Sequence, residues 1–596
     1  MRPGRAGRTL GPLPERTRIL TSPVRLTGEL HLAHLATLAS VDALVRRARA
    51  EGHEVSWQAA TLAGDLAGQT AVERELIREG SSRAAIGRDE FVERVRAYEA
   101  DARVRVTEDL HGLGIDVDLA ADALDMDAPV RAARTAFVRL YEAGHLVREE
   151  RVVATCPRCQ TVLDPADTVP GELEGEIITV RLAATADAVT ESDTTTVDVE
   201  VAAAELLPGA VAVAVPDGHP MAGTDVDLPI AATAVPVVVD GGATGPELVV
   251  PSHDPIGLEL ARRVGLPPVD VLDAEGIVRT PGPLEGLPRF AARAAARDLL
   301  EASGAVVGTR PETEAAPRCR RCLTVVVPRR GRHWFLPMAD MEVAAADVIR
   351  QEAVTFSPST ARDDLLARAG LSGDWCLSHQ VWAGEPVPVA RCLDCGQLDV
   401  AVEPSESCGK CMGTLAQDDD VFDARFVGAL WPLATAGWPG DDGGPAAAAP
   451  ETLLVVGPAG VVKWVLPMAA LSVGLAGVVP FARVAVHHVV TAPDDPDPLL
   501  PLDLGALASE HGERVLRAAL VAGGLELDWA RDLVVAVDDP PEGGAGLDAL
   551  VDAYNAAFAA GIPGSVMPQL AATLDEGVNP ESADRIRALA APILGD

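Results

Sequence analysis

Lysine is almost absent from this 596-residue sequence. Only Lys410 and Lys463 occur, and arginine supplies the remaining positive charge. Because 88 acidic residues face 50 lysines and arginines, the formal net charge at pH 7 is -38. Proteins that bind nucleic acids draw much of their affinity from Lys and Arg side chains that neutralise phosphates. The composition therefore argues against a polyanionic partner.

Aromatic residues are also scarce, at 3%, so the core has to be built from Ala, Val and Leu. The N-terminal residues 1–18 contain no apolar segment of the kind found in secretory signals, and we expect a cytoplasmic protein. One uncharged apolar stretch covers residues 464–482 and includes Pro467 and Gly474. It predicts a buried helix, a turn and a parallel strand rather than a membrane span.

The length of the chain exceeds what one hydrophobic core supports and predicts three or four domains. A strand, a helix and a second strand over residues 19–57 are typical of an α/β fold with a doubly wound parallel sheet of the Rossmann type. From residue 171 the pattern changes to alternating Val, Thr and Ala with Gly and Pro turns, which predicts an inserted β-rich domain. We place the domains at residues 1–170, 171–315, 316–535 and 536–596, where the first and third form one α/β domain and the last is a short helical remnant.

Eight of the nine cysteines form four Cys-x-x-Cys pairs, and only Cys376 is left over. Two such pairs complete a tetrahedral site, and four thiolates suit a structural Zn²⁺ with no open position. The first two pairs flank the insertion, whose ends must meet, and the last two form a compact ribbon over residues 392–411. Adventitious cysteines or a redox pair are the alternative. The two predicted zinc sites are Cys156, Cys159, Cys319 and Cys322, and Cys392, Cys395, Cys408 and Cys411.

Residues 26–34 read Leu-Thr-Gly-Glu-Leu-His-Leu-Ala-His, a glycine turn followed by two histidines one helical turn apart. The N-terminus of a helix favours an anion, and imidazoles there add hydrogen-bond donors. Thr27, Gly28, His31 and His34 are therefore candidate ligands of a nucleotide phosphate. Alternatively, the two histidines are ordinary, partly exposed helix residues.

The order of further segments resembles a valyl-type (Val/Ile/Leu) class I aminoacyl-tRNA synthetase, in a truncated and motif-degenerate form. The resemblance covers about residues 19–535 and implies a Rossmann domain that binds ATP with Mg²⁺, with Ala33 at a position that is Gly in the family. It also implies that the insertion is similar to the family's editing domain, which hydrolyses mischarged tRNA. The resembling segments include residues 56–57, 69–73, 87–91, 113–116, 136–138, 375–386, 417–439 and 479–490.

The sequence departs from the family pattern at several positions that the resemblance implies are functional. The stretch at residues 491–501, where the family has a Lys-Met-Ser-Lys-Ser loop, contains no Lys or Arg and three aspartates. Leu62 stands where the family has an aspartate for the substrate ammonium, and Ala459 stands where it has a carboxylate near the ribose. Without the lysines, the charge that grows on the pyrophosphate loses its stabilisation. We expect little tRNA charging and little tRNA binding.

The insertion keeps a few polar residues of the editing element. Glu205 aligns with its acid, and His253 and Asp254 are a candidate acid–base pair for residual editing, although a turn with an Asp-Pro step is the favoured explanation of these two residues. We therefore expect a degenerate binding or regulatory paralogue, whose partners are ATP or another nucleotide, a small amino acid or an unidentified protein. The alternatives are ATP-dependent activation of a small amino acid or carboxylate for a non-tRNA acceptor, or a residual editing hydrolase.

Overall fold

The computed structural model describes two compact units, each with its own core. The sheet unit takes its described residues from Met1–Leu146, Leu336–Leu377 and Trp382–Asp596, and the inserted unit consists of Val147–Phe335 and Ser378–Val381. The residues that the structure describes are 13–25, 30–50, 52–117, 119, 127–186, 194–231, 233–440 and 452–487. Thr27, Gly28, the stretch 491–501 and the C-terminal residues 536–596 lie outside them.

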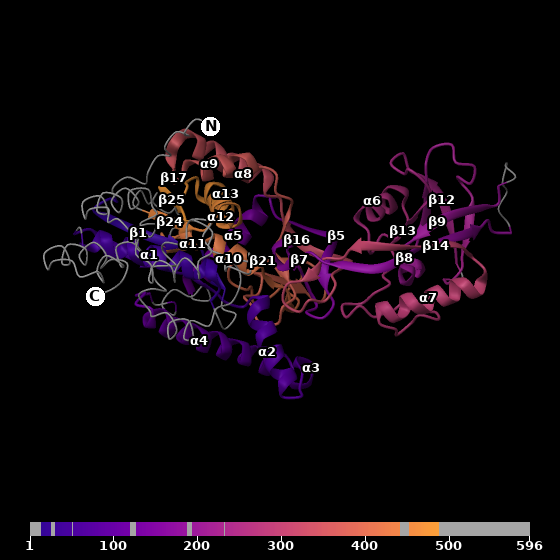
Figure 1. Cartoon of the computed structure of the whole chain (residues 1–596), viewed down its shortest axis with the longest axis horizontal. Coiled ribbons are helices and arrows are strands. Elements are labelled where there is room, and N and C mark those ends of the chain that lie inside the picture. Colours follow the sequence, from indigo (N-terminus) through magenta and orange to yellow (C-terminus); the bar gives the residue numbers. More distant parts are fainter. Residues whose placement is uncertain are drawn as a thin grey trace, which may run out of the picture. The chain divides into compact units, whose positions relative to one another are not determined.

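The sheet unit contains a five-stranded parallel sheet in the order β17-β25-β24-β1-β3 (Figure 1). The fold confirms the predicted doubly wound α/β architecture. All five residues of β24 are buried, as expected for a parallel strand covered on both faces. The chain runs from β1 to β3 on one side and later enters β24 on the other, so the switch point lies between β1 and β24. The strands are β1 (Arg16–Thr21), β3 (Glu54–Gln58), β17 (Thr355–Ser357), β24 (Thr452–Val456) and β25 (Arg483–Val486).

Helix α1 (Leu32–Ala50) connects β1 to β3, as the sequence predicts. Val41 and Val45 lie four residues apart and pack against Ile19 of β1 and Leu453 of β24. This contact fixes the first turn of α1 beside the switch point. The other helices of the unit include α2 (Leu66–Arg78), α3 (Arg83–Ile86), α4 (Arg88–Gly112), α5 (Asp127–Glu142), α8 (Ala339–Val348), η3 (Ile349–Ala353), α9 (Ser359–Arg368), α10 (Ala424–Ala429) and α11 (Trp431–Thr435). Its short strands include β2 (Val24–Arg25), β4 (Thr61–Leu62), β18 (Trp375–Cys376) and β23 (Val421–Phe422).

The first part of the apolar stretch, up to Ala476, lies in a continuous helical segment, Pro458–Ala476, that is long and apolar enough to cross a membrane. Half of an 18-residue window of this segment is buried. It consists of α12 (Pro458–Gly460), η4 (Val461–Val465) and α13 (Leu466–Ala476). Helix α13 packs on α8 and ends at Gly477, whose φ of 71° is left-handed. The parallel strand β25 follows, so the predicted order of helix, turn and strand is confirmed.

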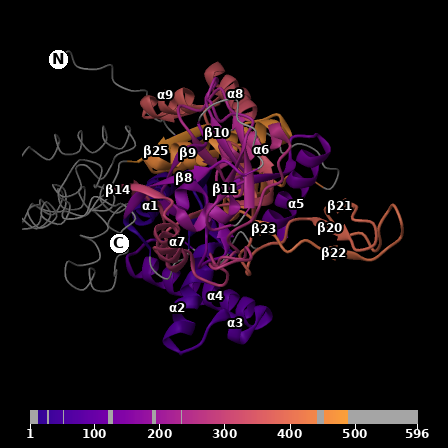
Figure 2. The same ribbon diagram turned by 90° about the vertical axis from the view of Figure 1, so that its right-hand side faces the viewer.

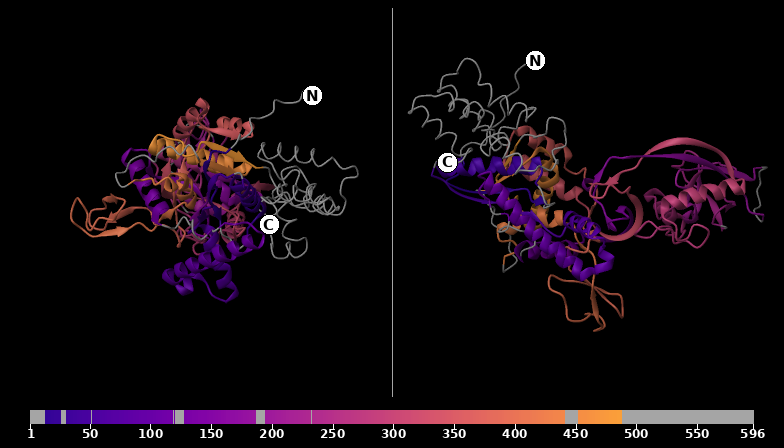
Figure 3. Two further views of the ribbon diagram at one scale, coloured as in Figure 1. Left: turned by 90° about the vertical axis from the view of Figure 1, so that its left-hand side faces the viewer. Right: turned by 60° about the horizontal axis from the view of Figure 1, so that its bottom comes forward.

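A small antiparallel ribbon belongs to the same unit and contains β20 (Val389–Cys392), β21 (Leu398–Val400) and β22 (Leu415–Gln417), with β20 in the middle. Figures 2 and 3 show this ribbon standing out from the helices and sheet of its unit. It has few large apolar side chains of its own, and Leu393 and Met412 are 68% and 76% exposed. Its fold therefore depends on something other than a hydrophobic core.

The inserted unit is rich in β-structure, as predicted. Strand β8 (Glu172–Ala183) pairs antiparallel with β9 (Thr196–Val201) and β14 (Val306–Ala315), and exposed and buried residues alternate along β9. Figure 1 shows helix α7 (Arg289–Ser303) running beside these strands. The remaining elements are β5 (Val147–Cys156), β6 (Thr161–Val162), η1 (Pro165–Asp167), β7 (Thr168–Val169), η2 (Ala204–Gly209), β10 (Ala212–Val215), β11 (Asp225–Leu228), β12 (Thr233–Val239), β13 (Glu247–Val249), α6 (Pro255–Val264), β15 (Arg318–Cys319), β16 (Val327–Leu336) and β19 (Ser378–His379).

Candidate functional site

The two predicted nucleotide histidines lie at the switch point of the parallel sheet. The amide of His34 donates to the carbonyl oxygen of His31 at 2.9 Å and to its Nδ1 at 3.3 Å, so His31 caps the first turn of α1. Because Nδ1 accepts this bond, the neutral imidazole of His31 carries its proton on Nε2. The two rings are stacked, with centroids 3.6 Å apart and an interplanar angle of 20°. The structure thus brings both side chains together at a helix N-terminus, an arrangement that favours an anion.

A third histidine, His487, directly follows β25 and contacts the first half of α1. The Thr37 hydroxyl donates to the carbonyl oxygen of Ala33 at 2.9 Å, so the 2.7 Å contact to Nε2 of His487 is a bond that the imidazole donates. The ring of His487 also lies against Gly457, where an added Cβ would be 3.1 Å from it. The ends of β24 and β25 and the start of α1 therefore converge. Sequence reasoning missed His487, because its neighbours in this site are far away along the chain.

A second feature of the sheet unit is a cavity of about 270 Å³ beside β4. Leu62 forms part of its wall and is 1% exposed, and Phe422 and Val427 add further apolar surface. Glu99 of α4 also lines it, although it is only 4% exposed. A cavity of this size is slightly below the usual range of about 300–1,000 Å³ for small-molecule sites, so it suits a small ligand. Sequence reasoning missed Glu99, which lies in an ordinary amphipathic helix.

Each predicted zinc site brings its four cysteines together, with all sulfur atoms of a site within 4.8 Å of one another. Individual Sγ–Sγ distances are 3.4 Å for Cys156 and Cys322 and 3.7 Å for Cys395 and Cys408. These separations are far longer than a disulfide of about 2.05 Å. They approach the tetrahedron edge of about 3.8 Å that follows from a Zn–S bond of about 2.3 Å. The donor set therefore fits a four-coordinate zinc ion.

The backbone of the cysteine pairs supports the same interpretation. Within the part of the chain that the structure describes, the non-glycine residues with positive φ are Gln160, Leu323 and Met412, and each directly follows the second cysteine of a pair. Gly396, with a φ of 72°, follows Cys395, the second cysteine of the remaining pair. A left-handed conformation costs a residue other than glycine about 1–2 kcal/mol and persists where surrounding structure imposes it. All four turns therefore place a left-handed residue directly after the second cysteine, and in three of them this residue is not glycine.

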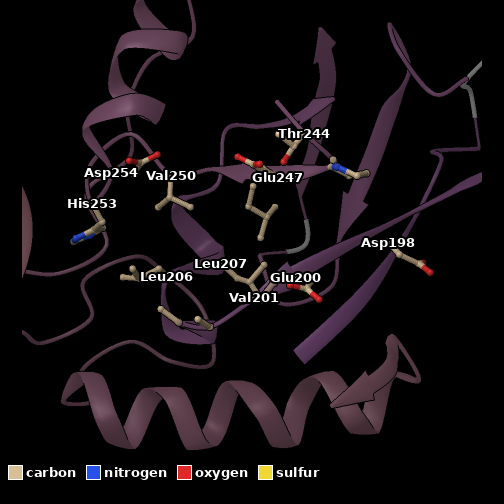
Figure 4. A pocket seen from close by; sticks show the side chains of 15 residues that line it. Asp198, Glu200, Val201, Leu206, Leu207, Thr244, Glu247, Val250, His253 and Asp254 are labelled. Atoms are coloured by element: carbon tan, nitrogen blue, oxygen red, sulfur yellow. The ribbon is translucent and has the colours of Figure 1, made fainter. Parts of the chain in front are cut away.

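The inserted unit contains a larger pocket, of about 570 Å³, that includes His253 and Asp254 in its lining. Figure 4 shows both residues at one end of the pocket, with the His253 ring turned away from Glu247. Nδ1 of His253 donates to the carbonyl oxygen of Pro328 at 2.7 Å, so Nε2 is its acceptor. Burial lowers the pKa of His253 and outweighs the opposing effect of the bond to Pro328, and nearby Arg329 lowers the pKa further.

Asp254 and Glu205 both have structural partners in the inserted unit. The Asp254 carboxylate is the N-cap of α6 and accepts from the amides of Ile256 at 3.1 Å and Gly257 at 2.8 Å. Glu205 is 2% exposed, and both its oxygens accept from Arg293 at 2.8 Å. Burial opposes the charge on Arg293, yet the hydrogen bonds that Arg293 donates to Glu205 hold the pKa of Arg293 above its usual value. Glu205 is not among the residues that line the pocket of His253, although Leu206 and Leu207 of the same segment line it.

Comparison with known proteins gives consistent matches along most of the chain. The family described as tRNA synthetases class I (I, L, M and V) matches residues 15–495. The chain is 33% identical over 487 residues to the valine–tRNA ligase of Streptomyces coelicolor, covering 79% of this chain and 54% of that protein. It is 32% identical over 492 residues to the valine–tRNA ligase of Thermotoga maritima, covering 80% and 56%. The chain therefore spans about half the length of the curated relatives it matches.

A likeness to solved structures supports the fold alone. The methionyl-tRNA synthetase of Mycobacterium tuberculosis, solved with methionyl-adenylate bound, superposes with a TM-score of 0.51 at 11% identity. The alignment covers 98% of this chain and 92% of that protein. The architecture of a parallel α/β sheet with additional β-rich sheets is thus shared at low sequence identity.

Proposed function

The chain belongs to the class I tRNA synthetases of the I, L, M and V group, and we propose that it binds ATP and a small amino acid in its sheet unit while charging tRNA poorly. It acts in this proposal as a binding or regulatory paralogue of the valyl type. The observation that carries the proposal is the pair of stacked imidazoles of His31 and His34 at the β1–β24 switch point. Ligands of open α/β sheets bind at this position.

The expectation of poor charging comes from the sequence rather than from the fold. Residues 491–501 carry Asp494, Asp495 and Asp497 and no cation. Loss of a single preorganised donor from a site that stabilises developing charge typically costs about 2.7–4 kcal/mol. Mg²⁺ prefers carboxylate ligands, so these aspartates remain compatible with nucleotide binding through the metal. ATP binding can therefore survive where rapid adenylate formation does not.

The first test separates nucleotide binding from chemistry. Isothermal titration with ATP and Mg²⁺ should show binding to the full chain, and a His31→Ala/His34→Ala variant should weaken it by at least about tenfold. His111→Ala, an exposed residue on α4, is the matched control and should leave the affinity unchanged. Unaltered ATP affinity in the double variant would overturn the assignment of the switch point.

The second part of the test is transfer to tRNA. Typical enzymes turn over at about 1 per second or faster, and we expect valine-dependent charging of purified tRNA to fall far below that rate. Charging at that rate, abolished by the double histidine variant, would restore an active ligase. Exchange of pyrophosphate across a panel of amino acids and carboxylic acids identifies whatever activation survives.

A further inference from the structure

Residues 378–381 belong to the inserted unit, although residues 336–377 separate them from the rest of that unit along the chain. We call residues 378–381 the clasp segment. Ser378 is fully buried, and its hydroxyl accepts from the amide of Trp334 on β16 at 3.0 Å. The next residue, His379, is only 8% exposed. The side chains of the clasp segment therefore contribute to the interior of the inserted unit.

Gln380 fixes the clasp segment to two strands of this unit. Its backbone amide donates to the Thr161 hydroxyl of β6 at 2.9 Å, and its side-chain oxygen accepts from the amide of Val162 at 3.1 Å. The side-chain nitrogen of Gln380 lies 3.3 Å from Nδ1 of His333 on β16, so the nitrogen donates and Nδ1 accepts. A protonated imidazole carries hydrogens on both nitrogens. His333 would therefore lose this bond on protonation.

The surroundings of His333 oppose a positive charge on its ring. His333 is 8% exposed, and a Cβ added to Gly331 would lie 2.3 Å from its Nε2, so the ring packs closely on its own strand. Burial is the largest cause that lowers the pKa of His333 to about 4, and His379, Arg329 and Arg148 lower it further. Each of these three neighbours carries or can acquire a positive charge.

Acidic neighbours within the inserted unit do not offset this effect. Glu149 of β5 lies directly opposite His333, but its carboxylate is bonded to Arg151 at 2.8 Å. The remaining charged residues of the β5–β16 pair occupy alternate positions on the other face: Glu150, Arg330 and Arg332. A proton on His333 would therefore be held among cations and away from water.

We propose that His333 and the clasp segment form a pH-sensitive device, which is closed when His333 is neutral and opens when His333 accepts a proton. In the open state the ring is solvated, and its pKa returns to about 6.5. The open state therefore binds the proton more tightly than the closed state. The closed state is fully favoured above pH 6.5 and loses stability as the pH falls from there towards about 4. This inference does not depend on the proposed binding of ATP and an amino acid.

Hydrogen exchange of the full chain, refolded with zinc, measures this opening. The amides of Trp334, Val162 and Gln380 should be protected at pH 7.5, because each donates one of the bonds to or from the clasp segment. Their protection factors should fall by about 20- to 30-fold between pH 7.5 and pH 5. This ratio follows from one proton that binds the open state with a pKa of about 6.5 and the closed state with a pKa of about 4.

A glutamine at position 333 separates the proton from the position of the side chain. In His333→Gln, the side-chain oxygen can accept from Gln380 but does not titrate, so protection should change by less than about twofold over the same pH range. His219→Gln, in the turn after β10, is the matched control and should keep the full pH dependence. Wild-type protection that does not fall with pH overturns the inference. A fall that His333→Gln shares also overturns it, because another group, such as the thiolates of the Cys156 cluster, would then be the cause.

Titration of the His333 ring by NMR is a second measurement, which remains decisive if His333→Gln does not fold. The signal of its Cε1 proton in the wild type should change with a midpoint near pH 4. A midpoint near the ordinary value of about 6.5 would overturn the inference. A histidine that binds its proton equally well in both states cannot drive the opening.

Discussion

The two units differ in the surroundings of their acidic and imidazole side chains. In the sheet unit, His31 and His34 from one segment and His487 from a distant one converge on the strand ends, and Glu99, which accepts from the amide of Gly64, lines a cavity. In the inserted unit, the polar side chains that resemble an editing site are engaged by the fold itself: His253 bonds to a carbonyl oxygen, Asp254 caps a helix, and Glu205 is paired with Arg293.

This difference shows that a residue that matches a family motif does not by itself identify a functional site. A side chain is a good site candidate when segments far apart in sequence bring it to a cavity or strand end together with others. It is a weaker candidate when its oxygens already satisfy nearby amides or a guanidinium. The cysteines meet this criterion in both units, since each unit gathers four of them into one cluster.

Breaking the cysteine clusters should have the largest effect of any substitution and should differ between the units. Cys156→Ser removes a ligand from a cluster that joins pairs separated by more than 160 residues, so the inserted unit should lose one zinc ion and unfold. A cross-link that closes about 100 residues contributes about 4.7 kcal/mol by chain entropy alone, against about 3 kcal/mol for a 15-residue loop. Zinc content by mass spectrometry and thermal unfolding of the purified variant measure both effects.

Two further variants serve as the comparison for Cys156. Cys408→Ser should also lose one zinc ion, but the unfolding should stay within the ribbon, whose two pairs are close along the chain. Cys376→Ser should leave the metal content unchanged, because this cysteine belongs to neither cluster. Wild-type protein that contains no zinc after refolding with the metal, and loses no stability with a chelator, would contradict the assignment of both sites.

The next largest effect concerns the buried ion pair of the inserted unit. Arg293→Ala should destabilise this unit by about 3–5 kcal/mol, because it leaves the Glu205 carboxylate buried without its guanidinium. Arg297→Ala, one turn further along α7, removes more exposed pairs with Glu176 and Glu301 and should cost less than about 1 kcal/mol. Urea unfolding of both variants measures the difference. Similar losses for the two would mean that Glu205 is not held mainly by this contact.

Much of the sheet unit could be predicted from the sequence because its signals are local. The periodicity of residues 19–57 indicates a strand, a helix and a strand, and the Cys-x-x-Cys spacing indicates a metal knuckle before any contact is known. His487 and Glu99 could not be predicted in this way. Their roles depend on Thr37 and Gly64, which are far from them in the sequence and reach them only through the crossover connections of the fold.

In the inserted unit, the sequence indicated chemistry where the structure also provides a local explanation. An Asp-Pro step can be a catalytic acid beside a histidine or the start of a helix, and residue types alone do not distinguish the two. The structure shows Pro255 at the first position of α6 with Asp254 as its cap. The left-handed backbone after each cysteine pair is a second feature that spacing alone could not show.

The smallest expected effect separates these two roles of Asp254. Asp254→Ala removes the bonds to the amides of Ile256 and Gly257 and should cost about 1 kcal/mol of stability, whereas Asp254→Asn should be nearly neutral because Asn caps helices as well as Asp. Asn keeps the cap but cannot act as a base. We therefore expect no measurable hydrolysis of threonine mischarged onto valine-accepting tRNA by the wild type or by either variant. The opposite outcome would be hydrolysis by the wild type that disappears in Asp254→Asn and in His253→Ala, while the Asn variant keeps its stability. That outcome would show that this pocket still edits. The contrast between the two units would then be smaller than their hydrogen bonds suggest.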